Sequence, residues 1–165
     1  MALQSFDFSG SDLEDEPLVA GPSGARARVL IADDNDTNRR VLAAMCELFG
    51  CASQVAKDGV EAVEAFADGE FDLVLMDVQM PRMDGVEATR AIRQGSAAGR
   101  RAPILAVTAN TDSADVRRYL AAGMAGVVAK PIDAGRLLEA MTAALAAGAA
   151  ADFPALRLVR RRPHA

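Results

Sequence analysis

Histidine is nearly absent from the sequence. The single histidine among 165 residues is His164, the penultimate residue, in a tail that we expect to be mobile. Its position excludes a catalytic triad with histidine, a histidine metal site and a phosphohistidine carrier from the folded part of the chain. The sequence also contains neither a glycine-rich Walker loop nor a dinucleotide-binding fingerprint.

Cysteines and long apolar runs are scarce as well. Cys46 and Cys51 are the two cysteines, and we interpret them as small buried hydrophobic residues rather than as a metal or redox pair. No apolar run reaches the ~18 residues of a membrane span, and residues 1–5 lack the basic start and apolar core of a secretory signal. With no export signal and no disulfide framework, we expect a cytoplasmic protein without a membrane partner.

Basic residues are outnumbered by acidic ones. The chain has 23 acidic and 18 basic residues, which gives a formal net charge of −5. This balance disfavours a nucleic-acid-binding surface over the whole protein, so we expect no nucleic-acid partner. With 51% hydrophobic residues, a chain of this length suits one compact domain with tails.

The composition divides the chain into three parts. Residues 1–27 are rich in glycine, serine, proline and acid, and we expect a flexible leader because such a segment buries too little apolar surface to fold. Residues 28–147 form the predicted domain. Residues 148–165 form a tail whose basic residues are Arg157, Arg160, Arg161 and Arg162. We interpret this tail as a solvated segment, with an electrostatic arm as the alternative.

The predicted domain alternates short buried strands with amphipathic helices. The predicted strands are 29–32, 53–56, 73–76, 104–107 and 127–129, and the predicted helices are 36–49, 60–67, 85–93, 113–122 and 133–145. We expect Asp36 or Thr37 to cap the first helix, and a loop over residues 95–101. Five β-α units predict an α/β fold, a doubly wound parallel sheet of the flavodoxin-like (βα)5 type with strand order 2-1-3-4-5.

Acidic side chains follow two of the predicted strands. Asp33 and Asp34 end the apolar run 29–32, and Asp77 ends the run 71–76. In a parallel sheet both runs finish at the same edge, where open α/β folds bind their ligands, so we expect the three carboxylates to converge. Oxygen ligands of this kind hold hard divalent cations, above all Mg²⁺.

Two further polar residues end predicted strands at the same edge. Thr108 follows the fourth strand and Lys130 follows the fifth. Alone, each candidate has an ordinary structural explanation: a cap or turn for the acids, a strand-end β-branched residue for Thr108, and a solvated lysine for Lys130. Their combination favours a functional site.

Four stretches of the sequence resemble the response-regulator receiver domain of two-component signalling. They are residues 29–35, 75–85, 107–109 and 130–131, and the second contains the run Met-Asp-x-x-Met-Pro-x-Met-Asp-Gly. The resemblance covers about residues 28–147. It implies that Asp77 is the phosphoacceptor, and that Thr108 donates a hydrogen bond to the phosphoryl group while Lys130 pairs with it.

The resemblance also implies a metal site. Asp34 would bind Mg²⁺, or Mn²⁺ in its place, directly, Asp33 would support it partly through water, and the backbone carbonyl of Gln79 would complete the protein ligands. A divalent cation and an ammonium would neutralise the phosphoryl oxygens that a weak aspartate nucleophile has to approach.

Some positions depart from the family pattern or modulate it. We expect a cis bond at Lys130-Pro131, as in the family. Strand five commonly carries an aromatic residue three positions before the lysine, where this chain has Val127, so the usual threonine-aromatic coupling is in doubt. Gln79 and Asn110 occupy positions that tune dephosphorylation in the family.

About twenty residues follow the last predicted helix, too few for an output domain, so we expect a stand-alone receiver. Its partners would be a histidine kinase or a histidine phosphotransferase, and an output protein that binds helix 113–122, strand 127–129 and helix 133–145. Its chemistry would be limited to self-phosphorylation from phosphodonors and autodephosphorylation, with no separate enzymatic domain.

Three alternatives stay open. The chain could be a phosphate shuttle or sink, or the detached receiver of a hybrid histidine kinase, which its motifs resemble in detail. It could be a non-phosphorylated interaction module, against which the intact acidic set argues. A Mg²⁺-dependent phosphatase of similar topology would need an acid where the chain has Gln79.

Overall fold

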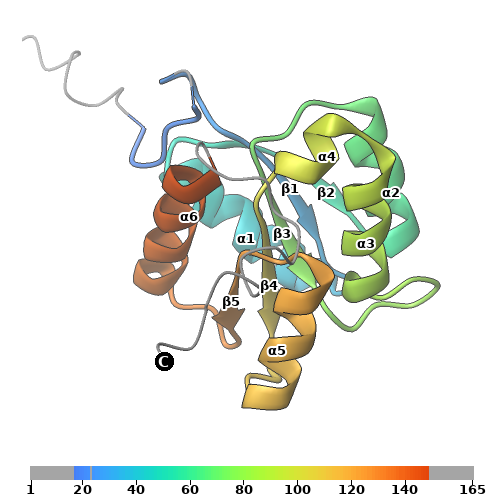
Figure 1. The fold of residues 1–165 in the computed structure, drawn as a ribbon. Coiled ribbons are helices and arrows are strands. Elements are labelled where there is room, and N and C mark those ends of the chain that lie inside the picture. Colours follow the sequence, from blue (N-terminus) through green and yellow to red (C-terminus); the bar gives the residue numbers. More distant parts are fainter. Residues whose placement is uncertain (1–16, 23, 149–165) are drawn as a thin grey trace, which may run out of the picture.

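The computed structural model describes residues 17–22 and 24–148. Their centre is a five-stranded parallel sheet with the strand order β2-β1-β3-β4-β5 (Figure 1). The strands are β1 (Arg28–Ala32), β2 (Ala52–Ala56), β3 (Leu73–Asp77), β4 (Ile104–Thr108) and β5 (Gly126–Ala129). The fold class and strand order predicted from the sequence are confirmed.

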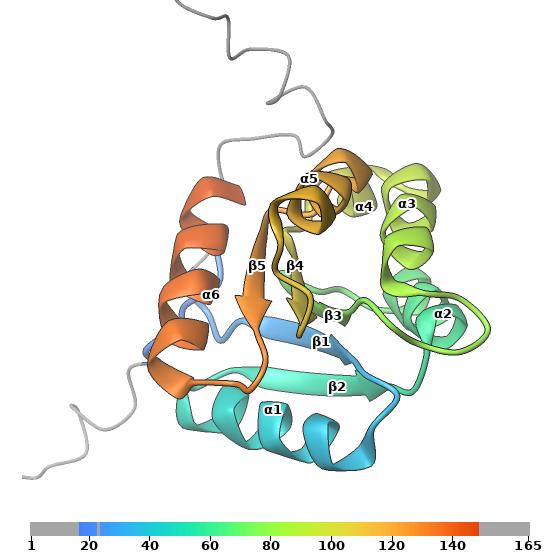
Figure 2. The same ribbon diagram turned by 90° about the horizontal axis from the view of Figure 1, so that it is seen from below.

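Helices cover both faces of the sheet. They are α1 (Asp36–Leu48), α2 (Gly59–Asp68), α3 (Gly85–Gly95), α4 (Ala97–Arg101), α5 (Ser113–Ala122) and α6 (Ala134–Gly148). Helices α1 and α6 pack on one face, and α2, α3 and α5 pack on the other (Figure 2). Within the described residues, no helix combines the length and the apolar character needed to cross a membrane.

The two faces of the sheet form two core clusters. In β3, Val74 and Met76 belong to the cluster under α2, α3 and α5, whereas Leu73 and Leu75 belong to the cluster under α1 and α6. This alternation follows the two-residue period of a strand. Every residue of β3 and β4 is buried, which explains why these strands read as continuous apolar runs in the sequence.

Polar side chains cap the helices that follow the strands. Asn35 caps α1 by accepting a hydrogen bond from the Asn38 amide at 3.0 Å. The expected cap, Asp36 or Thr37, is therefore wrong, because both residues are already helical and the extended residue before them is Asn35. Asp58, Asp84 and Asp112 cap α2, α3 and α5 in the same way.

Helix α4 replaces the loop that the sequence predicts over residues 95–101. Ser96 caps it through the Gly99 amide at 2.9 Å. Gly99 lowers the helix propensity of this short segment, and the guanidinium of Arg93 in α3 donates hydrogen bonds to the carbonyl groups of Gly99 and Ala102.

The end of the expected leader packs against the domain. Val19 is 2% exposed and belongs to the core cluster under α1. Its amide donates a hydrogen bond to the carbonyl oxygen of Phe49 at 3.1 Å, and a β-bridge joins Ala20 to Arg26. The flexible leader predicted through residue 27 thus contributes a core residue at its C-terminal end, while residues 1–16 and the basic tail 149–165 lie outside the described part.

The two cysteines are buried and form no disulfide bond. Burial raises the pKa of the Cys46 thiol to about 12 and also raises the pKa of Cys51. Both thiols are therefore neutral at physiological pH, and their interpretation as buried small residues is confirmed.

The Arg93 guanidinium ties α3 to the segments that follow it. Arg93 is 8% exposed. Its Nε and Nη2 donate to the carbonyl oxygen of Gly123 at 3.1 and 2.6 Å, and its Nη1 donates to the carbonyl oxygens of Gly99 and Ala102 at 2.7 and 2.5 Å. Burial lowers the pKa of Arg93 to about 10, so the group stays charged at neutral pH.

Replacing Arg93 by methionine should lower the free energy of unfolding by about 3 kcal/mol, because three carbonyl groups, two in or directly after α4 and one directly after α5, lose their donor. Urea denaturation measures this change. Arg90→Met, at an exposed position on the same helix, is the control and should cost less than about 0.5 kcal/mol. Equal losses in the two variants would contradict the role given to the buried guanidinium.

Candidate functional site

The carboxyl ends of four strands meet at one edge of the sheet and carry the polar residues singled out in the sequence. Asp33 and Asp34 follow β1, and Asp77 and Thr108 are the last residues of β3 and β4. Lys130 follows β5. The parallel register aligns these ends, since Asp77 lies beside Val107 and Thr108 beside Ala129.

The three carboxylates converge as predicted. Asp33, Asp34 and Asp77 each offer one oxygen, and these oxygens lie within 4.8 Å of one another. Asp33 is fully buried and Asp77 is 5% exposed, whereas Asp34 is exposed. Each oxygen of such a cluster repels the others, so the arrangement needs positive charge nearby.

One oxygen of the buried Asp33 has no hydrogen-bond donor. Its Oδ1 accepts the Asn35 amide at 2.9 Å, whereas its Oδ2 makes no hydrogen bond with any described residue. The Lys130 ammonium lies 3.1 Å from this Oδ2 and forms an ion pair with it. A buried carboxylate oxygen without a hydrogen bond, beside two other carboxylates, fits the oxygen donor set of a hard divalent cation.

The Lys130 ammonium bridges two of the acids. Its Nζ lies 3.1 Å from Asp33 Oδ2 and 3.2 Å from Asp77 Oδ1. Burial works to lower the pKa of Lys130, but its close contacts with Asp33 and Asp77 and the negative charges of these carboxylates outweigh it and raise the pKa above its ordinary value. Lys130 is therefore held as a cation within the site.

Asp77 has a strongly perturbed carboxyl group. Burial, followed by the negative charge of Asp33, raises its pKa from 3.8 to about 6, and Lys130 offsets part of this rise. The Gln79 amide approaches Asp77 Oδ1 at 3.4 Å. At neutral pH the carboxylate is mostly ionised, although burial and the negative charge of Asp33 disfavour its ionised form.

Thr108, the last residue of β4, is 3% exposed. Its Oγ1 accepts a hydrogen bond from the Asn110 amide at 3.0 Å. Its carbonyl accepts the Lys130 amide at 2.9 Å, which joins the ends of β4 and β5. The peptide bond between Lys130 and Pro131 is cis, as predicted.

The remaining predicted positions surround this centre. Gln79 and Asn110 are exposed, one after β3 and the other after β4. Val127 of β5 is half-buried and packs against the core cluster under α5.

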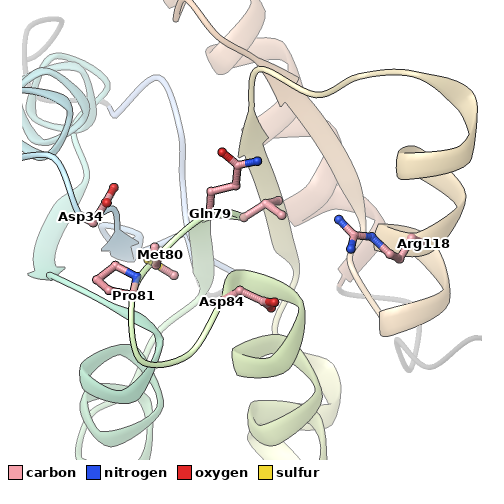
Figure 3. Close-up of a pocket in the computed structure, with 7 residues that line it drawn as sticks. Asp34, Gln79, Met80, Pro81, Asp84 and Arg118 are labelled. Carbon is pink, nitrogen blue, oxygen red and sulfur yellow. The ribbon is translucent and has the colours of Figure 1, made fainter.

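A pocket of about 560 Å³ opens beside the acids. It is lined by Asp34, Val78, Gln79, Met80, Pro81, Asp84 and Arg118. Figure 3 shows Arg118 reaching from α5 toward the side of the pocket formed by Gln79 and Asp84. The pocket thus joins the loop after β3 to the surface of α5.

Contacts that no sequence pattern indicates hold the loop after β3. Arg82, which has a left-handed backbone with φ 63°, forms an ion pair with Asp58 at 2.7 Å. The Gly59 amide donates to the Met83 carbonyl at 3.1 Å. The amide of Glu61 and, less strongly, Arg82 hold the pKa of Asp58 below its usual value against the effect of burial. Asp58 is recognisable in the sequence as a helix cap, but no spacing rule connects it to Arg82.

The sequence is similar to that of known proteins. Residues 29–142 match the family described as response regulator receiver domain. The autoinducer 2 sensor kinase/phosphatase LuxQ of Vibrio vulnificus is 39% identical over 109 residues, which are 66% of this chain and 12% of the kinase. The chain therefore spans about an eighth of the length of that relative.

Solved structures agree in fold. The chemotaxis protein CheY4 of Vibrio cholerae superimposes with a TM-score of 0.70 at 30% identity, over 73% of this chain and 100% of that protein. The receiver domain of a sensor histidine kinase from Pseudomonas aeruginosa gives a TM-score of 0.68 at 35% identity, over 74% of this chain and 99% of that domain. The latter structure has a magnesium ion coordinated in its active-site cleft.

The raised pKa of Asp77 predicts a pH-dependent stability. Between pH 3.8 and about 6 the folded chain binds more protons at Asp77 than the unfolded chain. The contribution of Asp77 to stability is therefore greatest below this range and is lost as the pH rises through about 6. Asp77→Asn should stabilise the metal-free protein at about pH 8 by on the order of 2 kcal/mol, and the gain should vanish near pH 4.

Urea denaturation in the presence of a chelator, repeated across this pH range, tests the prediction. Glu70→Gln removes an exposed carboxylate and should show no such trend. The prediction would be refuted if the free energy of unfolding of Asp77→Asn exceeded that of the native chain by the same amount at every pH, or if it were lower.

Proposed function

Because the chain belongs to the response regulator receiver domain family, we propose that it takes a phosphoryl group onto Asp77 from a phosphohistidine of a partner protein. It is a receiver domain of two-component signalling, of the kind found in hybrid histidine kinases. The observation that carries the proposal is the meeting of Asp77 with two further carboxylates and the Lys130 ammonium at one edge of the sheet. We propose that residues 28–147 form the domain that carries out this reaction, and that the protein works in the cytoplasm.

Asp77 would act as the nucleophile. One carboxylate oxygen of Asp77 would form a bond to phosphorus while the bond from phosphorus to the imidazole nitrogen of the donor breaks, and the imidazole would leave with that electron pair and take up a proton from solvent. The product is an acyl phosphate on Asp77. Transfer of this kind depends mainly on position and on charge stabilisation.

The surrounding side chains would serve that charge stabilisation. Lys130, already 3.2 Å from Asp77, would pair with a phosphoryl oxygen, and the Thr108 hydroxyl would donate to another. Gln79 and Asn110 are exposed amides that follow β3 and β4, and they would influence how a water reaches the acyl phosphate during hydrolysis.

The carboxylate cluster would hold Mg²⁺, or Mn²⁺ in its place. Asp34 and Asp77 would supply ligand oxygens, Asp33 would support the ion partly through water, and the carbonyl of Gln79 would complete the set. The Oδ2 of the buried Asp33, which forms an ion pair with Lys130 but accepts no hydrogen bond from the described residues, supports this assignment. When bound, the cation would supply positive charge to the oxygens of the acids and of the phosphoryl group.

A histidine kinase or a histidine phosphotransferase is the proposed donor. The sequence relatives include sensor histidine kinases, and residues 17–148 contain no histidine of their own. An output protein could then recognise the surface of α5, β5 and α6, provided that it binds the phosphorylated conformer more tightly than the other.

A phosphate shuttle is the second candidate. It is favoured by the same relatives, since the chain matches only a small part of each kinase. A shuttle should return its phosphoryl group rapidly to a phosphotransferase, whereas an output receiver should bind a partner more tightly when phosphorylated. Reverse transfer, followed by radiolabel, separates the two.

Incubation with acetyl phosphate and Mg²⁺ should add the mass of one phosphoryl group to the native chain. Asp77→Asn should show no adduct, because it lacks the nucleophile. Asp34→Asn should keep the fold but lose most of the adduct, because a metal ligand is missing. Intact-mass spectrometry, with Mg²⁺ affinity measured in parallel, gives both readouts.

Asp36→Asn is the matched control, since Asp36 lies two residues after Asp34 but outside the cluster. It should be phosphorylated like the native chain. An adduct that persists in Asp77→Asn would refute the assigned acceptor. A native chain that binds Mg²⁺ yet accepts phosphate neither from acetyl phosphate nor from a phosphotransferase would leave a non-phosphorylated interaction module as the better function.

A further inference from the structure

Tyr119 lies at the centre of a hydrogen-bonded connection between α5 and the site. Its side chain is fully buried in the core cluster under α3 and α5. The phenol hydroxyl donates to the carbonyl oxygen of Asn110 at 3.1 Å. A buried tyrosine hydroxyl needs such a partner, and here the partner is the loop between β4 and α5.

The same loop residue holds Thr108. The Asn110 amide donates to Thr108 Oγ1 at 3.0 Å. The backbone of Asn110 is therefore fixed on both sides, by a tyrosine from α5 and by the threonine hydroxyl oxygen. Because Oγ1 already accepts a hydrogen bond, the hydroxyl proton of Thr108 is left to donate to another acceptor.

Tyr119 also contacts the wall of the pocket. The guanidinium carbon of Arg118 lies 5.5 Å from the centre of the Tyr119 ring, and Arg118 lines the pocket beside the acids (Figure 3). By contrast, strand β5 offers the aliphatic Val127 to the same core cluster. The aromatic side chain that joins this part of the core to the β4–α5 loop thus comes from α5.

We propose that Tyr119 is a positioning residue for Thr108. Through Asn110 it orients the threonine hydroxyl toward the phosphoryl group, and through the same contact it couples the state of Thr108 to α5. The inference rests on the proposed function, since it requires a phosphoryl group at Asp77. It adds a residue from α5 to the set that governs phosphoryl recognition.

Tyr119→Phe removes the hydroxyl and leaves the ring. We expect it to weaken the binding of beryllium fluoride, a phosphoryl mimic, about fivefold in saturating Mg²⁺, as the loss of one hydrogen bond would. Mg²⁺ affinity should not change, because the carboxylates are untouched. Calorimetric titration of the full chain measures both constants.

A double-mutant cycle separates positioning from mere stability. In a Thr108→Val background, Tyr119→Phe should no longer weaken the binding of the mimic, whereas in Thr108→Ser, which keeps a hydroxyl, the weakening should persist. Thr89→Val is the matched control, because Thr89 also donates a buried hydroxyl to a backbone carbonyl, at 2.7 Å, but on α3. It should bind the mimic like the native chain.

The outcomes distinguish this inference from the proposed function. The role of Tyr119 would be overturned, and the proposed function left intact, by either of two results. One is an unchanged affinity of Tyr119→Phe for beryllium fluoride, and the other is an equal loss of that affinity with and without the Thr108 hydroxyl. A native chain that binds neither Mg²⁺ nor the mimic would overturn the proposed function and this inference with it.

The composition offers a direct optical readout of the coupling to α5. Tyr119 is the single tyrosine of the chain, which has no tryptophan, so ultraviolet emission reports on this residue. We expect the emission to change as beryllium fluoride saturates the site and to stay constant in Thr108→Val. Constant emission from a saturated native chain would overturn the coupling.

Discussion

The charges of the acidic cluster at the edge of the sheet are balanced in part by the ion pairs of the Lys130 ammonium with Asp33 and Asp77. Three carboxylates lie within 4.8 Å of one another there, and Lys130 is 3.1 and 3.2 Å from two of them. One cation cannot neutralise three anions, and the remaining imbalance shows in the pKa of Asp77, which burial and the charge of Asp33 raise to about 6. The fold therefore keeps a site that favours additional positive charge, and this property is what a receiver would use to bind a divalent cation and then a phosphoryl group.

Maintaining such a site requires rigid loops. The loop after β3 is fixed by Arg82, whose side chain reaches Asp58 at the start of α2, and by the Gly59 amide. Close packing completes the support, because a Cβ on Gly85 would overlap the carbonyl oxygen of Asp77. These contacts come from outside the acidic cluster, so the position of Asp77 is determined by packing and by a remote ion pair as much as by its own strand.

The parts of this structure that follow periodic rules were predictable from the sequence. The apolar runs at 29–32 and 73–76 gave the strands, and the acids at their ends indicated the site, because a parallel sheet brings such ends together. Contacts between distant segments were not predictable. Arg93 of α3 donates hydrogen bonds to the carbonyl groups of Gly99 and Ala102 at α4, and the amide of Val19 donates one to the carbonyl group of Phe49. Neither contact leaves a local pattern in the sequence.

Val127 stands on β5 where the family commonly has an aromatic residue. A missing aromatic residue on β5 puts the usual threonine-aromatic coupling in doubt, but it does not remove the need to connect the site with the helices that present the outer surface. The structure contains such a connection from Thr108 through Asn110 to Tyr119. A single net hydrogen bond of about 1 kcal/mol changes an equilibrium about fivefold, so this connection alone would bias two conformers modestly. A larger shift would need a partner that adds its own preference for one conformer, since a ligand moves an equilibrium only by its difference in affinity for the two states. For a receiver, the output is therefore expected to depend on partner binding as well as on phosphorylation.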